Sequence, residues 1–217
     1  MKVICLNDIN SIASQYLSEL RDKKIQKDSL RFRRNIERLG EIFGWEISKH
    51  LEYTEKDINT PLGIVSQKTL KDQPVLATIF RAGLPLHHGL LNVFDQAENA
   101  FVSAFRKYDS EKEFHIEVDY VASPDLNGKV LILADPMLAT GWSLTKVYFE
   151  LIKHGMPIHT HIVTVIAART GIEYLEEHLP VKDITIWTAG IDNELNAHSY
   201  IVPGLGDAGD LAYGEKL

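Results

Sequence analysis

The sequence of 217 residues has little of several features that mark particular classes of protein. It has a single cysteine, Cys5, so no disulfide can form within the chain and a reducing compartment is expected. No apolar run reaches the roughly 18 residues that a membrane span needs, and the first residues lack the basic-then-apolar order of a signal peptide. These absences predict a cytoplasmic protein that does not act at a membrane.

Positive charge is also scarce. The chain has 23 Lys and Arg residues against 30 Asp and Glu, which gives a formal net charge of −7. Such a balance does not favour nucleic acid as a partner bound through overall charge. The sequence contains no P-loop and no Gly-x-Ser-x-Gly elbow, so the classes that those motifs mark are not indicated.

Apolar segments with two different periods alternate along the chain, and no Pro-, Gly- or Ser-rich linker divides it. Strands are predicted at 74–80, 100–105, 129–133, 161–168 and 183–188, and helices at 10–27, 28–52, 84–94, 144–152 and 171–178. This alternation predicts one α/β domain with a parallel sheet flanked by helices. Its parts are N-terminal helices and an arm (1–72), an α/β core (73–188) and a Gly-rich tail (189–217).

The N-terminal part is predicted in more detail. The helix over 28–52 has Ser29 as a candidate cap and an apolar face, formed by Phe32, Ile36, Leu39 and Phe43. Residues 53–72 are polar and mixed, and they predict an extended arm or a hairpin. The segment 107–119 is charged and is read as an excursion from the core.

One segment combines an acidic residue with the start of a helix. Asp135 follows the predicted strand 129–133, and Ala-Thr-Gly at 139–141 precedes the helix that begins near Leu144. In an open α/β sheet, ligands bind at the carboxyl ends of strands, and the amides of a helix N-terminus favour phosphate. A carboxylate beside a phosphate site suits a ligand with ribose hydroxyls. The alternative is an ordinary turn with Thr and Gly as cap and turn residues.

The run Asp-Pro-Met-Leu-Ala-Thr-Gly at 135–141 resembles the phosphoribosyl-diphosphate (PRPP) loop of type I phosphoribosyltransferases, in the variant typical of uracil phosphoribosyltransferases. The resemblance implies that Asp135 holds the ribose hydroxyls and that the following residues hold the 5′-phosphate. The PRPP-binding residues of this loop would be Asp135, Pro136, Met137, Leu138, Ala139, Thr140, Gly141, Trp142 and Ser143.

Two further segments extend the resemblance. Ile-Phe-Arg-Ala-Gly-Leu at 79–84 is similar to the segment that supplies a diphosphate-binding arginine, which implies Arg81, and Arg106 falls where a second such arginine is placed. The tail 191–210 looks like the uracil-binding hood of the same family. By that resemblance Ile201, Gly206, Asp207 and Ala208 bind the base, and Asp207 also serves the PRPP side.

The resemblance implies a complete activity. The chain is expected to form UMP and diphosphate from uracil and PRPP in pyrimidine salvage, with Mg²⁺ held mainly by PRPP and waters. Its protein ligands stay undetermined. Asp135, Asp207 and Arg81 would be the catalytic residues. A homodimer or higher homo-oligomer is expected, with the N-terminal helices and the arm as candidate contacts.

The sequence departs from the family pattern at two places in the expected site. Trp142 stands where the family typically has Gly, and Lys107 and Tyr108 follow Arg106 where acidic residues are usual. These departures motivate an alternative, a catalytically degenerate relative that binds UMP or PRPP as a nucleotide sensor. A phosphoribosyltransferase for another base, such as a purine, is a second alternative, which the intact tail disfavours.

Overall fold

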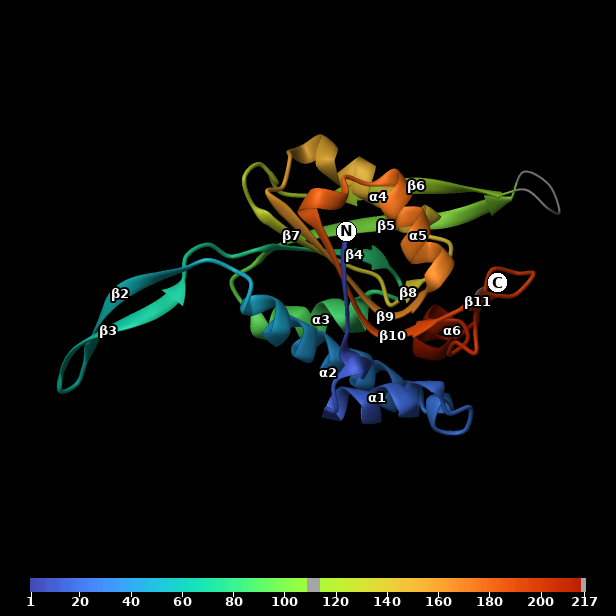
Figure 1. Cartoon of the computed structure of the whole chain (residues 1–217), viewed down its shortest axis with the longest axis horizontal. Coiled ribbons are helices and arrows are strands. Elements are labelled where there is room, and N and C mark those ends of the chain that lie inside the picture. Colours follow the sequence, from blue (N-terminus) through green and yellow to red (C-terminus); the bar gives the residue numbers. More distant parts are fainter. Residues whose placement is uncertain (109–113, 216–217) are drawn as a thin grey trace.

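The computed structural model describes residues 1–108 and 114–215, with the backbone alone at 105–108 and 114–116. A central sheet has the strand order β1–β10–β9–β7–β4–β5–β6, and the short β8 pairs with β9 (Figure 1). Within the described residues, every pairing in this sheet is parallel except that of β5 with β6. The strands are β1 (Lys2–Cys5), β4 (Val75–Phe80), β5 (Glu98–Tyr108), β6 (Phe114–Ala122), β7 (Val130–Ala134), β8 (Met137–Leu138), β9 (His159–Ala168) and β10 (Ile184–Asp192).

Helices cover both faces of the sheet, which confirms the α/β fold class. Successive residues of β7 show the two layers, because Ile132 packs in the core with α1, α2 and α3, whereas Leu131 and Leu133 pack in the core with α4 and α5. The helices are α1 (Ile12–Arg21), α2 (Ser29–Ser48), α3 (Leu84–Val93), α4 (Trp142–Leu151) and α5 (Arg169–His178). Short 3₁₀ turns lie at Leu6–Asp8, Ile25–Lys27, Ile152–His154 and Val181–Asp183.

The predicted apolar face of α2 is confirmed, but its predicted cap is wrong. All four residues of that face are fully buried. The helix is capped by Asp28, whose carboxylate accepts the Arg31 amide at 3.1 Å, and Ser29 is the first helical residue. Aspartate competes well with serine for this position because its charge also favours the positive end of the helix dipole.

Residues after Leu51 leave the body of the molecule as a hairpin. Strands β2 (Tyr53–Thr60) and β3 (Gly63–Leu70) pair with each other and project away from the sheet (Figure 1). Most of their side chains are exposed, including the apolar side chains of Leu62 and Ile64. The polar composition of the segment is therefore that of a two-sided solvated ribbon, as expected for the arm.

Several elements of the described part were not predicted, and each is short or lies at an edge. Strand β1 has four residues and owes its place to parallel pairing with β10. The segment 107–119, predicted to be a charged excursion, overlaps the end of β5 and the start of β6. Strand β6 pairs antiparallel with β5 at the edge of the sheet, where charged residues are common. The tail forms the small pair β11 (Glu194–Leu195) and β12 (Ile201–Val202) and the helix α6 (Ala208–Tyr213).

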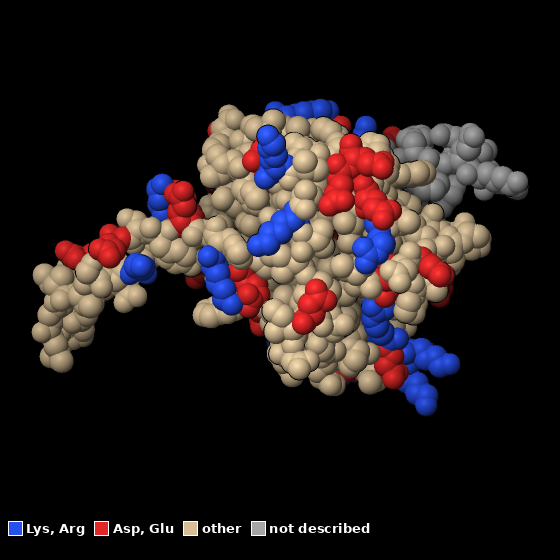
Figure 2. Space-filling view, in the orientation of Figure 1, with Lys and Arg blue, Asp and Glu red and all other residues tan. Residues whose placement is uncertain are grey.

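The surface of the described part mixes charges of both signs. Figure 2 shows Lys and Arg side chains scattered among Asp and Glu side chains on one face, with no continuous basic area there. None of the helices in the described ranges has both the length and the apolar character needed to cross a membrane.

Candidate active site

Asp135 lies at the carboxyl end of β7, next to the end of β4. Strands β7 and β4 are parallel neighbours, so Asp135 and Arg81, which follow their last residues, reach the same edge of the sheet. The Asp135 amide donates to the Val163 carbonyl at 3.0 Å, and its carboxylate accepts the Met137 amide at 3.3 Å. These bonds fix the carboxylate at the mouth of the loop that leads to α4.

The start of α4 has the geometry of a phosphate site. Gly141 is in the left-handed region, with φ of +82°, and a Cβ there would lie 2.9 Å from the Tyr174 ring. The chain turns at Gly141 so that the amides of the first helical turn are left without carbonyl partners in their own helix. Glycine is therefore required at position 141, because the left-handed φ disfavours other residues and the Tyr174 ring leaves no room for a Cβ.

Trp142 has ordinary helical backbone angles, because the left-handed conformation of this turn is that of Gly141. Trp142 is the first residue of α4, and its indole ring lies 6.5 Å from the ring of Tyr174 on α5. It is 41% exposed and is not among the described residues that line the cavity. The substitution of Gly by Trp at this point thus leaves the cavity open.

Arg81 pairs with the hood. Its guanidinium donates to the Asp210 carboxylate on α6 at 2.5 Å, and the Asp210 amide in turn donates to the Asp207 carboxylate at 3.0 Å. The peptide bond between Phe80 and Arg81 is cis. Asp207 caps α6, so a single chain of contacts links the end of β4 to the start of α6.

A cavity of about 760 Å³ lies between these elements. Its walls bring together the expected PRPP residues Arg81, Asp135, Met137, Ala139 and Ser143. The expected base residues Ile201, Gly206, Asp207 and Ala208 line the same cavity. Segments more than 100 residues apart in the sequence therefore form one site of the size used for small-molecule substrates.

Other expected residues lie elsewhere. Pro136 and Leu138 are buried, and the Pro136 carbonyl accepts the amides of Val165 and Ile166 on β9. Thr140, Gly141 and Trp142 form the turn into α4 without lining the cavity. The side chain of Arg106, like those of Lys107 and Tyr108, lies outside the described residues, although its backbone belongs to β5.

Several lining residues were not predicted. Phe80 is 37% exposed at the cavity wall and stacks on Phe101 with ring centroids 5.5 Å apart. Ser199 and Tyr200 line the cavity just before Ile201, and Asp210 holds Arg81. The second aspartate of the run Gly-Asp-Ala-Gly-Asp at 206–210 was the available signal for Asp210. The full lining is completed by Ile79, Ala82, Ser103, Ala104 and Gly209.

The electrostatics of the site centre on Asp135. Burial raises the pKa of the Asp135 carboxyl to about 7, from an ordinary value of 3.8, and the bond from the Met137 amide opposes this rise. A carboxyl with a pKa near neutrality is a mark of a functional site when it lies in a cavity. Its charge is costly without a ligand, and hydroxyl donors from a bound sugar would offset that cost.

No cluster of three or more His, Cys, Asp or Glu side chains that could hold a metal ion occurs within residues 1–108 and 114–215 as far as they are described. In the cavity, the carboxylates of Asp135 and Asp207 are oxygen donors of the kind that Mg²⁺ uses. Such a pair suits a hard cation that keeps most of its ligands from water and substrate.

Comparison with known proteins agrees with this geometry. A family model described as uracil phosphoribosyltransferase matches residues 9–215. A uracil phosphoribosyltransferase from Porphyromonas gingivalis is 52% identical over 217 residues, which is 100% of both chains. One from Pyrococcus furiosus is 41% identical over 206 residues, covering 94% of this chain and 86% of the relative.

A solved structure extends the similarity to three dimensions. The AQ2163 protein from Aquifex aeolicus superposes with a TM-score of 0.87 at 29% identity, and the match covers 99% of each chain. The sequence motifs, the cavity that unites them and the match over nearly the whole length agree with one another. The chain belongs to the uracil phosphoribosyltransferase family.

Proposed function

We propose that the chain transfers the phosphoribosyl group of PRPP to uracil, which yields UMP and diphosphate in pyrimidine salvage. The observation that carries this proposal is the shared cavity, in which Asp135 and the start of α4 face the segment Gly206–Ala208. A phosphate and ribose site on one side and a backbone-rich slot on the other suit the two substrates.

The PRPP half uses three kinds of group. The amides around Ala139 and Ser143 receive the 5′-phosphate, because a helix N-terminus attracts anions. The Asp135 carboxylate accepts hydrogen bonds from the ribose hydroxyls. The Arg81 guanidinium, which is already held at the cavity by Asp210, binds the diphosphate oxygens.

The base half uses backbone atoms. Uracil presents an N–H donor flanked by two carbonyl acceptors, and a chain of amides and carbonyls can match that pattern without a charged side chain. The segment Gly206–Ala208 and Ile201 line the cavity, and their amides and carbonyls are the groups that we propose for base binding. Buried polar groups left unpaired by a different base would cost binding energy, which gives selectivity.

The reaction is a substitution at the ribose C1 carbon. The C1–N1 bond to uracil forms, the C1–O bond breaks, and diphosphate leaves with the electron pair while the N1 proton passes to solvent. Positive charge develops on the ribose in the transition state, so catalysis rests on alignment and on charge stabilisation. Asp135 lies where it would both orient the ribose and stabilise that charge.

Mg²⁺ is the cofactor that the proposal includes. The oxygen donors at Asp135 and Asp207 fit it, and when bound it would neutralise the diphosphate as it leaves. The chain's own contribution is to orient the ribose and the diphosphate through Asp135 and Arg81. We also propose a homodimer or higher homo-oligomer, which the exposed apolar side chains of the β2–β3 arm support. The single cysteine supports a cytoplasmic location.

The direct test is turnover. The protein is incubated with uracil, PRPP and Mg²⁺, and UMP is measured by chromatography. We expect UMP with uracil but no nucleotide with hypoxanthine or adenine, and loss of UMP with Asp135→Asn. Binding of UMP or PRPP without turnover would instead support a nucleotide sensor, and a purine nucleotide as product would support another base.

A further inference from the structure

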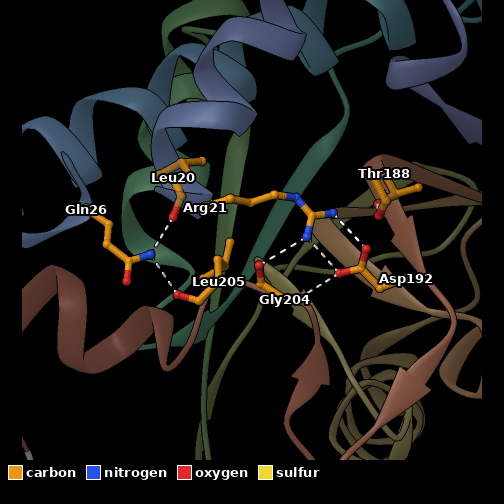
Figure 3. A network of polar contacts seen from close by, with 8 residues as sticks. Leu20, Arg21, Gln26, Thr188, Asp192, Gly204 and Leu205 are labelled. Atoms are coloured by element: carbon orange, nitrogen blue, oxygen red, sulfur yellow. Dashed lines mark hydrogen bonds and ion pairs between the residues drawn. The ribbon is translucent and has the colours of Figure 1, made fainter. Parts of the chain in front are cut away.

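A largely buried ion pair joins the N-terminal helices to the hood, just before the segment proposed to bind uracil. Arg21, the last residue of α1, donates from both terminal nitrogens to the two carboxylate oxygens of Asp192 at 2.8 Å (Figure 3). The same guanidinium donates to the Gly204 carbonyl at 3.1 Å, and the Gly204 amide donates back to Asp192 at 2.9 Å. Arg21 therefore binds the carbonyl of Gly204, and Asp192 binds its amide.

Gln26 adds a second attachment one residue further along. Its side-chain amide donates to the carbonyls of Leu20 and Leu205, at 2.7 and 3.0 Å (Figure 3). Leu205 directly precedes Gly206, the first residue of the segment proposed to bind uracil. We call Arg21, Gln26 and Asp192 the hood clamp.

The clamp acts on a turn whose own shape is fixed. Gly204 has φ of +59°, and a Cβ there would lie 2.1 Å from the Ile201 carbonyl oxygen. The contacts on either side of Gly204 therefore hold the turn that directly precedes Leu205 and Gly206. A change in the clamp would displace the start of the segment Gly206–Ala208.

The burial of the clamp makes its contacts specific. The Asp192 side chain is 7% exposed and that of Arg21 is 25% exposed. Removing one partner leaves a buried charge without compensation, and a lysine cannot reproduce the two-pronged contact of the guanidinium. The position of the hood therefore depends on these side chains in a way that a surface ion pair would not produce.

We infer that the hood clamp consists of positioning residues that set the affinity for uracil, although none of the three lines the cavity. The inference rests on the proposed role of Gly206–Ala208 in base binding. Backbone groups that recognise a small neutral base have no flexible side chain to correct a displacement, so a shift of the turn lowers affinity directly. Of the groups proposed to bind PRPP, Asp135 and the amides at the start of α4 lie on other elements than the hood, whereas Arg81 is joined to the hood through Asp210.

The test separates the two substrates. In Arg21→Met, Asp192→Asn and Gln26→Met, the KM for uracil is measured at saturating PRPP, and the KM for PRPP at saturating uracil. We expect the uracil KM to rise about 10- to 100-fold, since small displacements of binding groups have effects of this size. The PRPP KM should rise by a smaller factor than the uracil KM, because Asp135 and the amides at the start of α4 lie outside the hood. The kcat at saturating uracil should stay within about 3-fold, a range that corresponds to under 1 kcal/mol. An equal rise in both KM values would overturn the inference.

A matched control exists on the same helices. Arg31 of α2 makes a similar two-pronged pair with Glu19 of α1, at 2.8 and 2.9 Å, and these bonds join the two helices to each other and not to the hood. Arg31→Met loosens α1 against α2 and should leave the uracil KM unchanged. An equal rise in that variant would show that general loosening of the helices is responsible, and it would overturn the inference. Arg21→Lys should recover part of the uracil affinity.

Two further measurements keep the outcome unambiguous. Gln26→Met retains both charges of the ion pair, so it remains folded even if Arg21→Met does not, and thermal unfolding is recorded for every variant. Ala208→Leu adds volume at the cavity itself. An unchanged uracil KM in Ala208→Leu would contradict the proposed base site, whereas a raised KM there with unchanged clamp variants would contradict only the clamp.

Discussion

The guanidinium of Arg81 and the carboxylate of Asp210 meet at 2.5 Å and so join the end of β4 to the first turn of α6. Their side chains are 35% and 30% exposed, and Arg81 lines the cavity. This contact gives the arginine a defined position before a diphosphate arrives. Under the proposed function, the diphosphate would compete with the Asp210 carboxylate for the same guanidinium.

Arg81 is predicted to bind the leaving diphosphate. Arg81→Ala should lower kcat/KM for PRPP by about 10²- to 10³-fold, because a charged donor at the leaving group acts mainly in the transition state. The kcat/KM of Arg81→Lys should lie between those of Arg81→Ala and the wild type, because lysine keeps the charge but lacks the planar guanidinium. Steady-state kinetics measure this, with Arg34→Ala as the control, because Arg34 pairs with Glu37 on the exposed side of α2. An Arg81→Ala enzyme with wild-type kinetics would remove Arg81 from the site.

Ionisation of Asp135 should lower the free energy of unfolding of the ligand-free protein. Its folded-state pKa of about 7 lies above the ordinary 3.8, so the folded protein retains a proton that the unfolded chain releases. The free energy of unfolding therefore falls as pH rises from about 4 to 7, and the loss is complete above pH 7. Asp135→Asn removes this loss.

We expect the melting temperature of Asp135→Asn to exceed that of the wild type by about 2–8 °C at pH 8, or ~1–2 kcal/mol for a chain of this length. The difference should shrink toward pH 4. Thermal unfolding followed by circular dichroism measures it. Asp57→Asn, on the exposed arm, should show no such difference. A mutant that melts below the wild type at pH 8 would mean that the carboxylate stabilises the fold.

The same carboxyl predicts how PRPP binding depends on pH. The ionised carboxylate accepts hydrogen bonds from the ribose hydroxyls more strongly than the protonated carboxyl, so PRPP affinity should rise with pH until about 7 and then level off. Titration calorimetry between pH 5.5 and 8.5 measures this. Asp135→Asn reports the contribution of the phosphate groups of PRPP, and the difference between the two profiles should have its midpoint near pH 7. Parallel profiles would exclude a role for Asp135 ionisation.

The sequence predicted the central features of the fold because their patterns are strong and local. The alternating apolar periods gave the layers, and the four-residue face of α2 is buried as expected. The site was predicted where short motifs end strands or begin helices, as at Asp135 and Arg81. Parallel strands bring such ends to one edge whatever the rest of the chain does.

What escaped prediction depends on contacts between distant segments. Strand β1 is too short to show a period, and it forms because β10 offers an edge. The pairing of Arg81 with Asp210 spans 129 residues, and that of Arg21 with Asp192 spans 171. Nothing local marks Arg21, since an arginine at the end of a helix is ordinary. The direction of the Trp142 side chain could be established only with Tyr174 in place beside it.

Trp142 should be neutral for catalysis. Because it lies outside the cavity lining and its backbone is helical, Trp142→Gly should leave KM and kcat for both substrates within about 3-fold of the wild type, under 1 kcal/mol. Stability should fall by about 1 kcal/mol, since glycine is unfavourable in a helix and the contact with Tyr174 is lost. Kinetics and thermal unfolding check this, with Trp142→Phe retaining most of the stability. A large gain of activity in Trp142→Gly would indicate that the tryptophan obstructs the phosphate site and would revive the sensor alternative.

The arm should hold copies of the chain together. Leu62 is fully exposed and Ile64 is 72% exposed on the projecting hairpin, so neither side chain has a burying partner within the described part of its own chain. Exposed apolar side chains grouped on a projecting element are typical of surfaces that contact another protein, and a second copy of the chain is the partner that we propose. Ile64→Lys should therefore shift the chain toward monomer, measured by analytical ultracentrifugation over a range of concentrations. Ile158→Lys makes the same change at an isoleucine that is 59% exposed outside the arm, and it should leave the oligomer intact. If Ile158→Lys dissociates the oligomer and Ile64→Lys does not, the contact between copies lies near the start of β9 and not at the arm.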